Sequence, residues 1–136
     1  MIGAAFELAL SAHAGQTDKA GMAYIGHVAR VAAGVTDEID VVVALLHDVV
    51  EDCDIPLAQI ADQFGPRVAE AVDAITRRPD ERPETYYARV AANPIATRVK
   101  RADIADNSHP ARLALLDAET RDRLTRKYQT ALRHLS

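Results

Sequence analysis

The chain has 136 residues, 49% of them hydrophobic, and a formal net charge of −4. This length normally makes one domain and this apolar content excludes a disordered chain, so we expect a single domain over residues 1–136. The mild charge gives no electrostatic reason for a nucleic-acid partner, and the longest apolar run, Val41 to Leu46, is too short to span a bilayer, so we expect neither nucleic acid nor membrane as a partner.

The N-terminal segment opens without basic residues, and Glu7 interrupts its apolar stretch, so we interpret it as a helix and not as a signal peptide. A wide apolar stripe is expected on this helix, formed by Phe6, Leu8, Ala9, Leu10 and Ala12.

Glycines and prolines divide the rest of the chain. Gly34 suits the C-terminal end of a helix, Pro66 suits a first helical position, and Asn93-Pro94 favours a boundary. No segment alternates apolar and polar residues, so we predict an all-α bundle of about seven to eight helices without a sheet. After the N-terminal helix, the predicted helices cover residues 24–33, 38–52, 56–65, 66–76, 83–92, 94–107 and 117–135. The apolar face of the last one is expected to comprise Leu124, Tyr128, Ala131, Leu132 and Leu135.

Cys53 is the only cysteine. A disulfide framework within one chain is therefore impossible, and a cytoplasmic location is the simplest expectation.

The stretch from Val41 to Asp52 carries the strongest chemical signal. Its first half is apolar all round, which is typical of a helix that runs through a core, and its second half groups an imidazole with three carboxylates. On a continuous helix these four side chains form one patch. Because crowded carboxylates repel one another and lose hydration, a divalent cation would explain the arrangement. The polar residues of this patch are His47, Asp48, Glu51 and Asp52.

The alternative is a solvated acidic helix end. A His-Asp pair alone is common by chance, but negative charge at a helix C-terminus is unfavourable with respect to the helix dipole, so this alternative explains the patch less well.

Two further candidates lie elsewhere in the chain. His27 has apolar neighbours, and a lone histidine in such a setting is more often a core residue than a ligand. One helix face further along the chain carries Lys100, Asp103 and Asn107, which makes Asp103 a second candidate ligand. The alternative is that Lys100 and Asp103 form an exposed ion pair. Together, the two imidazoles of His27 and His47 and the two carboxylates of Asp48 and Asp103 would suit Mn²⁺, Fe²⁺, Zn²⁺ or Co²⁺ better than Mg²⁺ or Ca²⁺.

The order of these residues resembles that in the HD phosphohydrolases. The surrounding sequence is similar to the ppGpp hydrolase domain of RelA/SpoT proteins and their small stand-alone relatives. The resemblance covers roughly residues 8 to 110. Its pieces are the segments at 12–16, 21–27, 44–52, 64–65 and 100–103, followed by Asn107.

The resemblance implies an all-α HD-domain fold and a Mn²⁺ ion bound by His27, His47, Asp48 and Asp103. It also implies that Glu51 and Asp52 assist the attacking water, that Asn107 contacts the nucleoside, and that the reaction removes the 3′-pyrophosphate of (p)ppGpp.

We add Lys19 and Lys100 as candidates for stabilising charge on phosphoryl oxygens, with solvated surface charge as the alternative for each. His13 could brace a metal ligand or be a core histidine.

The chain departs from this family at two substrate-contact positions. Asp18 stands where the alarmone hydrolases carry an arginine that stacks on guanine, and Pro110 stands where they carry a threonine. A hydrolase of another nucleotide, such as NADPH or a nucleoside phosphate, is therefore an alternative. There are two further alternatives. One is a non-catalytic sensory module that binds a nucleotide or a metal, and the other is a helical interaction domain without metal.

Overall fold

The helices begin and end largely where prolines and glycines predict. The computed structural model describes residues 1–136, contains ten helices and no sheet, and has one isolated bridge between Thr17 and Ala23. Eight of the helices have eight or more residues, which confirms the all-α prediction. The helices are α1 (Ile2–Ala12), α2 (Tyr24–Ala33), α3 (Glu38–Leu46), α4 (Val49–Cys53), α5 (Leu57–Phe64), α6 (Pro66–Ile75), α7 (Pro83–Ala91), α8 (Pro94–Asn107), α9 (Pro110–Leu113) and α10 (Ala118–Leu135).

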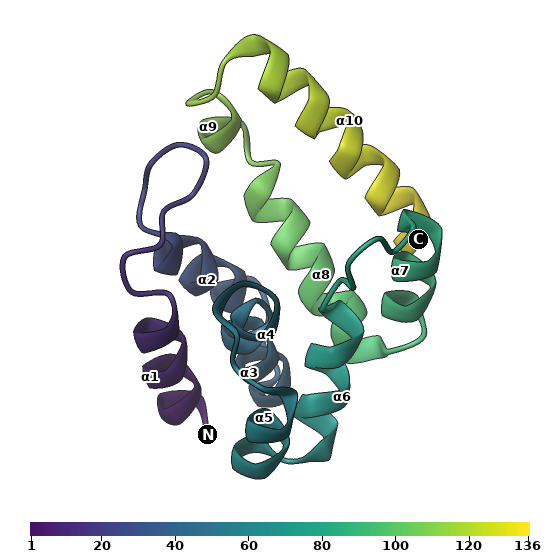
Figure 1. The fold of residues 1–136 in the computed structure, drawn as a ribbon. Helices are drawn as coiled ribbons and strands as arrows, with labels where there is room; N and C mark the ends of the chain where they lie inside the picture. The colour runs from purple at the N-terminus through teal and green to yellow at the C-terminus, as the bar shows by residue number, and fades with distance from the viewer.

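Helix α3 runs through the centre of the molecule, as its apolar sequence predicts. It packs against α1, α2, α6 and α8, and Figure 1 shows it between α1 and the rest of the bundle. Its residues Val42, Val43, Ala44 and Leu46 are fully buried. The end of α3 is thereby held at the meeting point of α2 and α8.

The predicted continuous helix over residues 38–52 is wrong, because the chain leaves the helical path at His47 and Asp48. In a continuous helix the amide of Asp48 would bond to the carbonyl of Ala44. Here that carbonyl accepts the Nδ1–H of His47 at 2.5 Å, and a new helix, α4, begins at Val49. The local bond between the histidine ring and the backbone therefore accompanies the break.

The apolar stripes predicted on the first and last helices are too wide. Helix α1 packs against α3 through the small residues Ala5 and Ala9, so Phe6 and Leu10 remain 40% and 48% exposed. On α10 the side chain of Leu132 is 43% exposed. Helix α1 thus buries a narrow face of small residues, whereas α10 buries Leu124, Ala131 and Leu135 and leaves Leu132 outside.

The C-terminal helices close one end of the bundle. Helix α10 packs against α7 and α8, and the C-terminus lies beside α7 (Figure 1). None of the ten helices combines the length and apolar character needed to cross a bilayer.

An ion pair between Glu81 and Arg89 fastens the loop before α7 to that helix. Two hydrogen bonds from the Arg89 guanidinium lower the pKa of Glu81 to about 2. Because this pKa is depressed in the folded state, the pair contributes stability above the unfolded value of about 4.3, and the contribution disappears as the pH falls towards 2.

We expect Glu81→Gln to lower the free energy of unfolding at neutral pH and to have a smaller effect below about pH 4. Denaturant unfolding of both proteins between pH 7 and pH 2.5 measures the difference. A difference that is constant with pH would contradict this role of the carboxylate. The exposed Glu84, which lies on α7 itself and is 64% accessible, provides a matched Glu→Gln control.

Candidate metal centre

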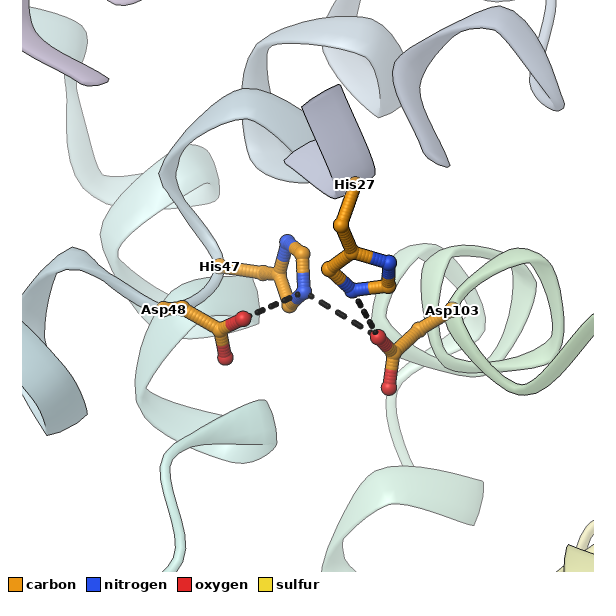
Figure 2. Close-up of side chains that lie close together, drawn as sticks. All are labelled: His27, His47, Asp48 and Asp103. Carbon is orange, nitrogen blue, oxygen red and sulfur yellow. Dashed lines mark hydrogen bonds and ion pairs between the residues drawn. The ribbon is translucent and has the colours of Figure 1, made fainter. Parts of the chain in front are cut away.

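Four side chains from three parts of the chain converge at the inner end of α3. His27 comes from α2, Asp103 from α8, and His47 and Asp48 from the break between α3 and α4 (Figure 2). One potential ligand atom from each lies within 4.8 Å of the others, and the two imidazole rings have centroids 6.0 Å apart. The structure thus brings together the four residues predicted as metal ligands.

The ring of His47 is oriented by its bond to Ala44. Because Nδ1 donates its proton to that carbonyl, Nε2 carries the free lone pair of the neutral ring. Nε2 is buried and has no hydrogen-bond partner, although it lies 3.0 Å from Asp48 Oδ2 and 3.4 Å from Asp103 Oδ1. A nitrogen lone pair and two carboxylate oxygens repel one another at these distances, and a cation bound between them removes the repulsion.

The spacing of the donors fits a transition-metal ion. Bonds of about 2.0–2.2 Å from imidazole and carboxylate ligands place opposite donors about 4.4 Å apart at most, close to the 4.8 Å that contains all four. A set of two nitrogens and two oxygens suits Mn²⁺, Fe²⁺ or Zn²⁺. The residues present therefore fit a divalent cation.

The charges in the cluster are strongly coupled. Burial disfavours the charged form of His47, but Asp48 and Asp103 outweigh it and raise the pKa of His47 well above its ordinary value. Burial likewise opposes ionisation of Asp103, yet Lys100 and the two imidazoles hold its pKa well below its usual range. Burial opposes ionisation of Asp48 too, but His47 lowers its pKa. Both carboxyl groups therefore stay ionised, and a proton on His47 competes with a metal ion for the same place.

Glu51 and Asp52 lie on α4, just beyond the proposed ligands, and bond to different partners. Glu51 accepts the backbone amide of Arg77 at 2.7 Å, and Asp52 accepts the side-chain amide of Gln16 at 3.4 Å. Burial raises the pKa of both carboxyl groups, and the charge of Asp48 raises them further. A raised pKa makes a carboxylate a better proton acceptor.

The three predicted substrate residues have different surroundings. Lys100 pairs with Asp103 at 2.9 Å, and this pair is largely buried, not exposed on the helix surface. Asn107 donates to Asp103 at 3.2 Å, which places the amide beside the cluster. Lys19 lies on the loop between α1 and α2, at the wall of a cavity of about 260 Å³. That cavity is also lined by Asp18, Tyr24, Asn107, Arg112, Leu116, Leu124 and Tyr128.

His13 packs beside this region without touching a proposed ligand. Its Nδ1 lies 2.7 Å from Gln16 Oε1, and its ring centroid is 4.9 Å from that of Tyr24. Tyr24 in turn donates its hydroxyl to Asp48. Tyr24 is therefore the residue that braces the carboxylate of a proposed ligand.

Sequence reasoning missed three further polar residues. Asp106 and Arg112 contact His27 at 2.6 Å and 3.2 Å, across 79 and 85 positions of the chain, and no spacing pattern signals contacts of that range. Lys127 lies on α10 with an exposed side chain, and its pKa is lowered by desolvation and then by Lys100 and Lys19. The chain has only three lysines, so all of its lysines gather in one region.

A family model described as an HD domain matches residues 5–105 of this chain. Among characterised relatives, the guanosine-3′,5′-bis(diphosphate) 3′-pyrophosphohydrolase of Haemophilus influenzae is 32% identical over 133 residues, which are 88% of this chain and 20% of that protein. The protein of the same name from Vibrio cholerae is 41% identical over 76 residues, 53% of this chain and 11% of that protein. The chain spans a fifth or less of the length of these relatives.

The fold is similar to a solved structure of nearly the same size. That structure is described as a metazoan ortholog of SpoT that hydrolyses ppGpp and plays a role in starvation responses. The two share 28% sequence identity with a TM-score of 0.83, over 98% of this chain and 84% of the other.

Proposed function

Because the chain belongs to the HD domain family, we propose that it is a metal-dependent phosphohydrolase that removes the 3′-pyrophosphate of ppGpp. The observation that carries this proposal is the convergence of four donor atoms within 4.8 Å, with the unpartnered His47 Nε2 among them. The names of the relatives supply the substrate.

The metal ligands in this proposal are His27, His47, Asp48 and Asp103, and we propose Mn²⁺ as the ion. A bound divalent cation supplies Lewis-acid activation of water and neutralises charge on phosphoryl oxygens. The protein's part is to hold four donors in place before the ion arrives. The bond from His47 to Ala44 and the hydroxyl of Tyr24 on Asp48 fix two of them.

Glu51 and Asp52 would accept and relay the proton of the attacking water. Both lie within two turns of the ligands on a short helix, and burial raises the pKa of each. A base with an elevated pKa binds a proton more firmly and can deliver it to the leaving group later.

The cations around the cluster would bind the phosphates. Lys100 remains charged beside Asp103, and Lys19 stands at the cavity wall with no carboxylate among its close partners. Lys127 adds a third ammonium group whose pKa its two neighbours lower. Like charges held together repel one another, and a polyanionic ligand relieves this repulsion.

The cavity between the loop after α1 and helix α10 would take the nucleoside. Its volume of about 260 Å³ is below the usual range of about 300–1,000 Å³ for small-molecule sites, so it would hold part of a nucleotide. Asn107 lies at its inner edge, between Asp103 and Arg112, where it can contact a sugar or base.

Incubation of the purified chain with Mn²⁺ and ppGpp tests the proposal. We expect release of pyrophosphate and formation of GDP, measured by ion-exchange chromatography. A parallel assay with NADPH in place of ppGpp tells whether the enzyme removes a 3′-pyrophosphate or a 2′-phosphate. Metal binding without turnover of either nucleotide would contradict the assignment as a hydrolase.

A further inference from the structure

His27 is held by a second layer of charged residues that no sequence pattern singled out. Its Nδ1 lies 2.6 Å from Asp106 Oδ2, and its Nε2 faces the metal cluster, 2.8 Å from Asp103 Oδ1. The ring is 1% exposed, so no solvent competes for either nitrogen. Each ring nitrogen therefore faces a carboxylate, Nδ1 towards Asp106 and Nε2 towards the metal cluster.

The contact between Arg112 and the same ring nitrogen agrees with this assignment. Arg112 Nη1 lies 3.2 Å from His27 Nδ1, but both atoms converge on Asp106 Oδ2, at 2.8 Å and 2.6 Å. Two N–H groups that donate to one carboxylate oxygen account for all three distances. A metal ion that takes the lone pair of Nε2 would therefore leave the ring proton on Nδ1, where Asp106 accepts it.

Arg112 joins this layer to the cavity. Its guanidinium also donates to Asn107 Oδ1 at 2.9 Å and to Asp18 Oδ2 at 2.8 Å, and it lines the cavity described above. Asp18 in turn accepts the backbone amides of Ala20 and Met22, which closes the loop before α2. A planar guanidinium with several donors can bridge these groups at once, and an ammonium group cannot.

We propose that Asp106 and Arg112 are positioning residues, which hold His27 in the tautomer that presents Nε2 to the metal while fixing one wall of the cavity. The inference rests on the proposed metal centre. A carboxylate behind a ligating histidine fixes its tautomer and ring orientation, and loss of such a partner typically weakens metal binding about 10- to 100-fold.

Titration of the full chain with Mn²⁺, with free ion followed by electron paramagnetic resonance, tests the proposal without an activity assay. We expect the dissociation constant to rise about 10- to 100-fold in Asp106→Ala. Asp106→Asn, which keeps one acceptor oxygen, should bind with intermediate affinity, and Arg112→Lys should lose less than Asp106→Ala. Arg30 bonds to the other oxygen of Asp106 from an exposed position, so Arg30→Ala is the matched control and should bind nearly as wild type does.

Nuclear magnetic resonance of the Zn²⁺-loaded protein adds a signature that a general loss of stability does not produce. We expect a slowly exchanging Nδ1–H signal from His27 in wild type and in Arg30→Ala, and its loss in Asp106→Ala. Folded Asp106→Ala that binds Mn²⁺ as wild type does, with the signal intact, would overturn the proposal and leave the proposed function standing. Wild type that binds no Mn²⁺ would overturn both.

Discussion

Replacement of His47 by alanine should abolish stoichiometric metal binding and lower the rate of ppGpp hydrolysis by about a thousandfold. Among the four proposed ligands, the substitution removes the one whose nitrogen is buried without a partner, and it leaves Asp48 and Asp103 facing each other. A divalent cation contributes several kcal/mol to phosphoryl transfer, and each ~1.4 kcal/mol corresponds to a factor of ten in rate.

Metal analysis of the purified variant, with turnover measured in added Mn²⁺, checks this expectation. His134→Ala is the matched control, because that histidine stacks on Tyr87 near the C-terminus and contacts none of the proposed ligands. A His47→Ala protein that still holds one equivalent of metal would place the ion elsewhere in the chain.

Substitution of Glu51 by glutamine should separate binding from chemistry. The change removes the charge and keeps the shape, and the side-chain oxygen can still accept the amide of Arg77. Metal affinity should therefore stay within a few-fold of wild type. The turnover number should fall by about 10²–10⁴, the usual contribution of a general base.

Parallel measurements of Mn²⁺ binding and of kcat test this separation. The exposed Glu84 again offers a matched Glu→Gln control, which should change neither quantity. Full activity in Glu51→Gln would exclude this residue from proton transfer and leave Asp52 as the candidate. Loss of metal in the same variant would instead make Glu51 part of the ligand set.

The fold was predictable because its boundaries are local. Pro66, Pro94 and Gly34 mark helix ends by their own backbone preferences, which need no knowledge of the tertiary structure. The widths of the buried faces were not predictable in this way. Phe6 and Leu10 lie outside because Ala5 and Ala9 bring α1 close to α3, and that choice depends on the partner helix.

The four proposed metal ligands could be singled out from residue types and from the resemblance, but the residues that contact them from behind could not. Asp106 is one of two acidic residues on α8, and Arg112 follows a segment with no periodicity. Their significance comes from contacts across more than 70 positions of the chain. The break at His47 was missed because the apolar pattern of α3 continues through Val49 and Val50 without a proline or glycine.

That break determines how far the His-Asp pair can be transplanted. On an unbroken helix, neighbouring side chains leave the axis about 100° apart, so adjacent residues share a patch but point in different directions. At the interruption between α3 and α4, Nε2 of His47 and Oδ2 of Asp48 lie 3.0 Å apart. Grafting the dipeptide alone into a regular helix of another scaffold would scatter the two donors, so a designer must copy the kink together with the residues.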